Sequence, residues 1–245
     1  MVTAGPHHAA PDEGRHGSDD RAGSPWATAT RVTRALACWT LLLPAALSAQ
    51  DASAALARAQ QAYRSTRTFA AQFTQTIDNP MLGAPQRAVG SMFLAPPDRF
   101  AMRFTEPAGD RIVADGQWLW IYTPNAMPNQ VIRQPIPRAG SASPNLMAQF
   151  VDRPLERYTV TYGGQETVSG VAVDVLRLTP RTDDLPFRSA EIAVARSDGL
   201  LRRIEVVERS GQRRTLVLHG IRHNEPIPPQ EFRFEVPRGV RVVGG

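Results

Sequence analysis

Two histidines and an acidic pair are the residues whose chemistry could serve catalysis in this chain. His219 and His223 lie four residues apart, with Glu225 close by. They fall at the end of a predicted strand, where this spacing does not direct both imidazoles at one metal ion as it would on a helix. Asp183 and Asp184 are adjacent in a predicted loop, whereas a glycosidase needs two carboxylates that face each other across a cleft. We interpret all of them as solvated surface groups.

The familiar catalytic motifs are absent from the sequence. It contains no Gly-x-Ser-x-Gly motif, no glycine-rich phosphate loop and no dinucleotide fingerprint. Its one cysteine, Cys38, excludes an intrachain disulfide and a cysteine-rich zinc site. The sequence therefore predicts no enzymatic activity, no cofactor and no metal.

Charge is the next constraint on function. The 28 basic residues are all arginine, against 23 acidic residues, which leaves a net charge of +5. Arg202-Arg203 and Arg213-Arg214 fall on neighbouring predicted strands, but each pair divides between the two faces of its strand, so no basic stripe forms. Because the chain also carries an export signal, we predict no nucleic-acid partner. A solvated arginine surface is favoured over contact with acidic headgroups or an acidic partner.

The first fifty residues read as a leader rather than as part of the fold. Arg31 and Arg34 precede the apolar stretch Ala35–Ala46, and small residues follow as far as Ala49. This order is typical of a secretory signal peptide. We predict a disordered extension at residues 1–30, a signal peptide at 31–49 and one exported domain at 50–245. Cys38 lies near the start of the apolar core and not after it, which argues against lipidation.

The exported part begins with a helix and continues as strands. Residues 51–66 are rich in alanine, and Asp51 or Ser53 is expected to cap the helix. From Phe69 onward the hydrophobic period changes from 3.6 to 2. The predicted strands are Phe69–Phe73, Gly90–Leu94, Arg99–Thr105, Arg111–Ala114, Gln117–Tyr122, Val131–Gln134, Arg157–Tyr162, Val171–Thr179, Ala190–Arg196, Leu201–Arg209, Arg213–Ile221 and Glu231–Val236.

Turn residues and one insertion complete the predicted fold. Asp115-Gly116, Gly163-Gly164, Asp198-Gly199 and Ser210-Gly211 are expected to close hairpins. Residues 135–156 are rich in proline and interrupt the strands, with a short helix expected at Asn145–Phe150. The fold class is therefore mainly β with some α: an unclosed antiparallel β-barrel of about eleven strands, with an N-terminal helix and a helical insertion that could act as a lid.

Apolar and aromatic residues are concentrated in the first half of the strands. Trp118, Trp120 and Tyr122 share one face of their strand, while Leu119 and Ile121 share the other. Large apolar residues also occur on the neighbouring strands and in the insertion, namely Phe93, Phe100, Met102, Phe104, Leu146, Met147 and Phe150. Periodicity alone leaves two alternatives open, a packed core or an apolar ligand cavity under a movable lid.

A resemblance to a known family favours the cavity. The runs Gly90–Leu94, Pro97–Phe100, Ile112–Gly116 and Leu119–Tyr122, together with Phe69–Gln75, resemble the LolA family of periplasmic outer-membrane lipoprotein carriers. The resemblance implies a periplasmic chaperone that binds the acyl chains of lipoproteins and carries them from the inner to the outer membrane. It also implies an inner-membrane ABC transporter as donor and an outer-membrane receptor as acceptor. We expect a monomer.

The resemblance also nominates site residues. We predict that the acyl chains contact Phe93, Phe100, Met102, Phe104, Trp118, Trp120, Leu146, Met147, Phe150 and Ile192. Family members often carry a basic residue, tied to the lid and to release, where this chain has Pro96. Arg99 and Arg103 are the candidates to replace it.

Three other functions compete with the carrier. A regulatory module with the same half-barrel could sense lipids or lipoproteins, although such regulators usually carry a second domain. A secreted hydrolase with an apolar pocket would require His219. A membrane-anchored receptor would require an acylated N-terminus, which the position of Cys38 disfavours.

Overall fold

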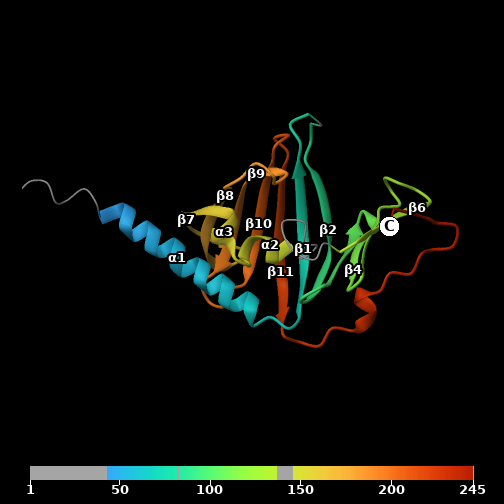
Figure 1. Ribbon diagram of the computed structural model, residues 1–245, viewed down its shortest axis with the longest axis horizontal. Helices are drawn as coiled ribbons and strands as arrows, with labels where there is room; N and C mark the ends of the chain where they lie inside the picture. The colour runs from blue at the N-terminus through green and yellow to red at the C-terminus, as the bar shows by residue number, and fades with distance from the viewer. Residues whose placement is uncertain (1–42, 82, 137–145, 245) are drawn as a thin grey trace, which may run out of the picture. The chain divides into compact units, whose positions relative to one another are not determined.

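The computed structural model describes residues 43–81, 83–136 and 146–244, and all its described strands belong to one sheet (Figure 1). The predicted disordered extension and most of the predicted signal peptide lie outside these residues. The strands are β1 (Phe69–Asp78), β2 (Gln86–Ala95), β3 (Arg99–Glu106), β4 (Ala108–Asp115), β5 (Trp118–Tyr122), β6 (Gln130–Pro135), β7 (Tyr158–Val168), β8 (Val171–Pro180), β9 (Phe187–Ala195), β10 (Leu201–Glu208), β11 (Arg213–His223) and β12 (Arg241–Val243).

The sheet is unclosed, as the sequence predicts. Its order within the described residues is β12-β6-β5-β4-β3-β2-β1-β11-β10-β9-β8-β7, so β7 and β12 are the two edges. Strands β1 to β11 pair antiparallel, and β12 is added parallel to β6. The long pairing of β1 with β11 joins the first half of the strands to the second and makes one continuous surface.

Three helices lie on one face of the sheet, which we call the helix face. They are α1 (Leu43–Arg64), α2 (Leu146–Val151) and α3 (Pro154–Arg157), and in Figure 1 they cross in front of the strands from β7 to β11. The helical insertion predicted at Asn145–Phe150 is therefore present. Residues 137–145 of the same insertion lie outside the described part of the chain.

Helix α1 begins earlier than the sequence predicts and ends at Arg64 instead of residue 66. Asp51 and Ser53 lie inside the helix, so neither caps its start. Small side chains let α1 approach the sheet closely, and its buried positions are Ala52, Ala55, Leu56, Ala59 and Ala62. At Gly199 a Cβ atom would come within 2.6 Å of the Arg58 carbonyl oxygen, so the β9–β10 turn requires a glycine beneath the helix.

Two other predictions are wrong in an instructive way. The expected strand at Glu231–Val236 is a 3-10 helix, η1 (Pro229–Phe232), followed by unpaired chain. The alternating apolar residues Phe232 and Phe234 pack onto a face of the sheet. A segment that lies on a face cannot pair its backbone with a strand, so the apolar alternation here does not produce one. The sequence did not predict strand β12, at the edge of the sheet, because three residues are too few to show a hydrophobic period.

The turn predicted at Gly163-Gly164 is also wrong. Both glycines lie inside β7, where the register with β8 shifts between Tyr162 and Gly164. This bulge uses the positive φ of 106° at Gly164, a conformation that favours glycine. The hairpin closes instead at Ser169 and Gly170, between β7 and β8. The turns at Asp115-Gly116, Asp198-Gly199 and Ser210-Gly211 do connect adjacent strands, as predicted.

Candidate functional site

The helix face carries a large apolar cluster that joins both halves of the sheet to α1 and α2. Of the predicted site residues, Phe100, Met102, Met147, Phe150 and Ile192 are buried in this cluster, and Phe104 packs against it. The structure therefore brings these six side chains together, although they come from strands and a helix far apart in the sequence. Leu146 begins α2.

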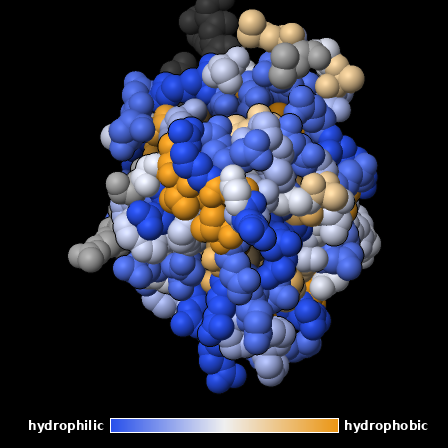
Figure 2. All heavy atoms as spheres, turned by 90° about the vertical axis from the view of Figure 1, so that its right-hand side faces the viewer, coloured by the Kyte–Doolittle hydropathy of each residue, from blue (hydrophilic) through white to orange (hydrophobic). Residues whose placement is uncertain are grey.

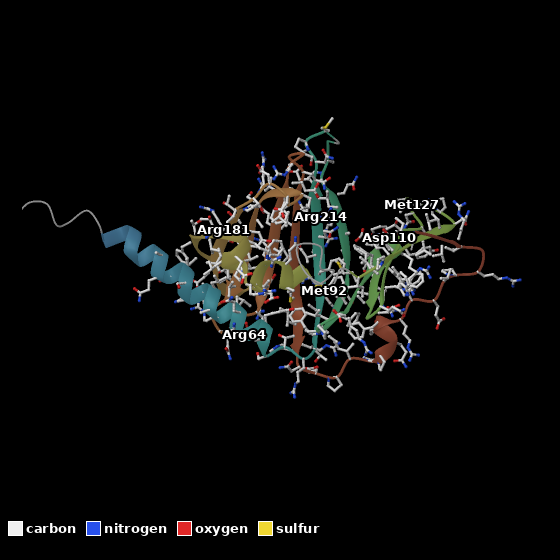
Figure 3. All side chains as sticks on the ribbon, viewed as in Figure 1. Arg64, Met92, Asp110, Met127, Arg181 and Arg214 are labelled. Carbon is white, nitrogen blue, oxygen red and sulfur yellow. The ribbon has the colours of Figure 1, made fainter. Side chains whose placement is uncertain are left out.

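The local pairing explains how β1 to β3 present this surface. Phe73 faces Gly90 across the β1–β2 ladder, and its ring would lie 2.8 Å from a Cβ atom at that position. Gly90 thus leaves room for the Phe73 ring, which makes an edge-on contact with Phe104 at 5.1 Å between centroids. Next along β2, Met92 is 1% exposed in the middle of the helix face (Figure 3).

Helix α2 presents its apolar side to the sheet through three aromatic rings that meet beneath it. The ring of Phe150 lies 6.0 Å from that of Phe187 and 6.3 Å from that of Tyr158. All three side chains are buried. A helix of six residues is too short to be stable alone, so these contacts must hold it in place.

A polar tether adds to these contacts. The Arg157 guanidinium donates to the carbonyl oxygens of Gln149 at 2.7 Å, Asp152 at 2.9 Å and Ala148 at 3.3 Å. These carbonyls lie at the C-terminal end of α2, where most acceptors lack a partner within the helix and a cation is favoured. The Tyr158 hydroxyl donates to the same Gln149 carbonyl at 3.1 Å.

Arg157 is itself fixed to the sheet. Its carbonyl oxygen accepts a hydrogen bond from the Arg181 backbone, and the Arg181 side chain donates to the carbonyls of Leu155 and Tyr158 (Figure 3). The tether therefore runs from the sheet to α2. Sequence analysis missed Arg157; its place at the end of the insertion, immediately before a strand, was the signal that could have found it.

The two arginines predicted to hold the lid lie elsewhere. Arg99 is exposed at the start of β3, and none of its described contacts reaches α2. Arg103 faces away from the helices, where its Nε atom lies 2.7 Å from a Glu231 carboxylate oxygen and its Nη2 donates to the Gln230 carbonyl at 3.1 Å. Arg103 thus anchors the C-terminal strap, which we define as residues 224–240.

The strap covers the opposite side of the sheet, and three predicted site residues lie on that side. Phe93 and Trp120 pack with Ala101, Val113 and the strap's Phe232. Trp120 stacks on the strap's Phe234 at 5.4 Å, and Trp118 lies under the Arg133 guanidinium at 4.4 Å. The structure therefore separates Phe93, Trp118 and Trp120 from the cluster on the helix face.

The strap end of the molecule also exposes apolar surface. Figure 2 views the right-hand side of Figure 1 and shows apolar side chains gathered among hydrophilic ones. In the C-terminal segment Val236, Val242 and Val243 are each about 40% exposed.

A buried acid fastens α1 to the second half of the sheet. Asp174 of β8, 5% exposed, accepts hydrogen bonds from Arg58 of α1 and, at 2.9 Å, from the Tyr162 hydroxyl. Burial and then the bond to Asp174 raise the pKa of Tyr162, so its hydroxyl stays protonated at neutral pH and can donate. These contacts fix α1 to the second half of the sheet.

No metal or catalytic centre stands out in the part of the chain that the structure describes. His223 pairs with the Thr66 hydroxyl at 3.0 Å, and His219 lies opposite Gln72 in the β1–β11 ladder. Among the described residues no three metal-ligating side chains gather. Nor is any described helix both long and apolar enough to cross a membrane.

Comparison with known proteins decides the family. Residues 64–235 match the family model described as outer membrane lipoprotein carrier protein LolA. The chain belongs to the LolA family. An outer-membrane lipoprotein carrier protein of Chromobacterium violaceum is 27% identical over 203 residues, which cover 83% of this chain and 94% of that protein. One of Pseudomonas aeruginosa is 25% identical, over 87% of this chain and 99% of its own.

Comparison with solved structures concerns the fold. An uncharacterized conserved protein of Thermus thermophilus superposes with a TM-score of 0.51 at 14% identity, over 80% of this chain and all of that one. The LolA family membership covers all of β1 to β11, α2 and α3, so the helix face and its tethered α2 fall within the family domain.

Proposed function

We propose that this protein is a periplasmic carrier that binds the acyl chains of lipoproteins and takes them from the inner to the outer membrane. The observation that supports this most is the family match across β1 to β11 together with the apolar cluster on the helix face. The related proteins are themselves named outer-membrane lipoprotein carriers. The proposal extends to export by the signal peptide at residues 31–49 and to a mature domain at 50–245.

The physical need for such a carrier is large. Each methylene group of an acyl chain costs about 0.8 kcal/mol to expose to water. A lipoprotein with several acyl chains therefore cannot cross an aqueous compartment unaided. The carrier must cover the chains and still release them, which favours an apolar surface under a part that can move.

Helix α2 is the part best suited to move. In the described structure its Met147 and Phe150 occupy the same cluster as Phe100 and Met102 of β3. We propose that acyl chains take the place of these side chains when α2 lifts from the sheet, and that Arg157 restores the closed position. Transfer then needs no chemical step, and the partners are the donor transporter and the acceptor receptor.

The test is a release assay. The purified protein is added to spheroplasts that display a newly made outer-membrane lipoprotein, together with a compatible transporter. We expect a soluble one-to-one complex in the supernatant. Phe104→Glu, at a half-buried position of the cluster, should abolish it, and so should Phe100→Glu. Thr105→Glu, exposed on the same strand, is the matched control and should release normally.

Thermal unfolding of each variant separates a lost site from a lost fold. If the wild-type protein leaves the lipoprotein in the membrane, the carrier proposal fails. If it releases the lipoprotein and a folded Phe104→Glu variant does so equally well, the site proposed on the helix face is wrong.

A further inference from the structure

Methionine sulfur atoms gather where α2 meets the sheet. Five of the six methionines follow the proposed signal peptide, and three of these, Met92, Met102 and Met147, are buried in the apolar cluster on the helix face. We call these three the buried methionines. Met81, in the turn between β1 and β2, is 89% exposed, and Met127, between β5 and β6, is half-buried. The chain therefore carries both covered and accessible thioethers.

Two of the buried methionines lie side by side on the sheet. Met92 of β2 and Met102 of β3 are directly opposite each other in the β2–β3 ladder. Such a pair points to one face of the sheet, with Cβ atoms about 5 Å apart. Ala71 pairs with Met92 on its other side, and Ile112 pairs with Met102. The row across these four strands therefore contains no polar side chain.

Helix α2 brings the third methionine to the same cluster. Met147 and Phe150 are three residues apart, so they share the side of α2 that packs against the sheet. Met92, labelled in Figure 3, belongs to the same cluster from the side of the sheet. The buried methionines thus lie on both sides of the contact that must open when α2 lifts.

Oxidation would change the character of this surface. A methionine sulfoxide is polar where the thioether is apolar, and its oxygen requires a hydrogen-bond donor. The hydroxyls of Tyr158 and Tyr162, which adjoin the cluster, already donate to the Gln149 carbonyl and to Asp174. A sulfoxide here would compete for donors that are in use, and the surface would lose its affinity for alkyl chains.

Helix α2 controls access to these sulfur atoms. In the closed position Met92 is 1% exposed and Met102 is 5% exposed, so an oxidant dissolved in water does not reach them. The hydrogen bonds from Arg157 hold α2 in this position. A motion of α2 that admits an acyl chain also admits water and its solutes. An acyl chain that occupies the surface excludes them again.

We propose that the buried methionines are an oxidation site, open to peroxide when the carrier is empty, whose sulfoxides stop the uptake of acyl chains. The inference rests on the proposed function for the motion of α2 and for the ligand. A sulfur lone pair attacks one oxygen of hydrogen peroxide, so that an S–O bond forms and the O–O bond breaks. The proton of the attacked oxygen moves to the departing hydroxide, which leaves as water. Sulfur loses two electrons and the peroxide gains them.

The first arm of the test measures oxidation at each methionine. The protein, purified from the periplasmic fraction of producing cells, is treated with hydrogen peroxide, digested with trypsin and analysed by mass spectrometry. Arginines separate the five methionines from one another, so each falls in its own peptide. We expect the buried methionines to be oxidised at least tenfold more slowly than Met81. Arg157→Ala should raise their rates at least tenfold and leave Met81 unchanged, whereas Arg153→Ala should change neither.

The second arm measures the consequence for binding. Fluorescence anisotropy follows a labelled synthetic triacylated lipopeptide, and each protein is compared with itself before and after peroxide. The wild type should lose at least tenfold in affinity, and methionine sulfoxide reductases supplied with a dithiol should restore it.

Variants assign this loss to particular sulfur atoms. Met92→Leu/Met102→Leu/Met147→Leu replaces them with a side chain of similar volume that peroxide does not oxidise. Its affinity after peroxide should stay within twofold of its own value before. Met81→Leu/Met127→Leu is the matched control and should lose affinity as the wild type does. Circular dichroism checks the fold of each protein, and Met92→Leu/Met102→Leu serves the same comparison if the triple variant unfolds.

The outcomes separate this inference from the carrier function. Equal oxidation rates for Met81 and the buried methionines, or no effect of Arg157→Ala, overturn the inference. So does an oxidised wild type that binds the lipopeptide as before, or a folded triple variant that loses affinity as the wild type does; in both cases the carrier function stands. If the unoxidised wild type does not bind the lipopeptide, the carrier function fails, and the claim that sulfoxides stop acyl-chain uptake fails with it.

Discussion

The Arg157 guanidinium donates a hydrogen bond of 2.7 Å to the carbonyl oxygen of Gln149, and this bond joins α2 to the β7 edge of the sheet. The guanidinium also reaches the carbonyls of Ala148 and Asp152, so one side chain donates to three carbonyl oxygens at the end of a six-residue helix. The position of α2 therefore depends on two separate kinds of contact, the apolar side chains beneath it and the cation at its end.

Removing this cation should loosen α2 without unfolding the sheet. Hydrogen bonds to charged groups contribute about 1.5–3 kcal/mol, which corresponds to roughly a 10- to 100-fold change in an opening equilibrium. In Arg157→Ala we expect the amide of Asp152, bonded to the Ala148 carbonyl, to exchange its hydrogen faster by that factor. Hydrogen exchange followed by mass spectrometry measures it. Arg153→Ala, at a 70% exposed side chain of the same segment, should leave the rate unchanged.

The fixed position of α1 should depend on Asp174. Asp174→Asn removes the negative charge of the carboxylate that accepts hydrogen bonds from both Arg58 and Tyr162. Because Arg58 is 37% exposed, water replaces part of the lost interaction, and we expect the free energy of unfolding to fall by about 1–3 kcal/mol. Urea denaturation provides the measurement. Glu156→Gln, which removes an exposed ion pair with Arg153, should cost less than about 1 kcal/mol. Equal losses in the two variants would contradict the role of Asp174.

The strap should detach when its aromatic contact is removed. Phe234→Ala deletes the ring that stacks on Trp120 at 5.4 Å and contacts Tyr122 at 5.7 Å. We expect trypsin to cleave after Arg233 and Arg238 several times faster, because the detached segment enters the active site of the protease more often. Acyl-chain binding should stay unchanged, since the strap and the helix face lie on opposite sides of the sheet. A parallel loss of acyl binding would show that the strap supports the site.

Alkaline pH should test the hydroxyl of Tyr158. Burial raises the pKa of this phenol above its ordinary value of 10.0, because removal from water disfavours the charged phenolate. The neutral hydroxyl donates to the Gln149 carbonyl. The stability from the neutral form is fully present below pH 10 and is lost as the pH rises through the higher pKa of the folded state. Tyr158→Phe should remove this part of the alkaline destabilisation. Urea denaturation at pH 8 and pH 11 should then show a smaller difference for the variant than for the wild type.

The sequence predicts which side chains share a face of each strand, but it does not predict which segment of the chain covers that face. The alternation in β5 correctly separates Leu119 from Trp120, because successive side chains of a strand point to opposite sides. Which side the helices cover depends on contacts across the whole sheet, so Trp120 was expected beside Phe100 and lies instead under the strap. The same alternation made residues 231–236 look like a strand, because packing on a face and pairing at an edge leave the same apolar period.

The sequence by itself determined the β class, the N-terminal helix, the helical insertion and the family, since these depend on local periods, turn residues and short motifs. The tertiary structure alone decided the role of each arginine. Arg103 meets the strap and Arg157 meets the end of α2, while both have the same charge and reach in the sequence. Only the folded chain brings a particular carbonyl or carboxylate within hydrogen-bonding distance of a guanidinium, and that proximity separates an anchor of the strap from a tether of α2.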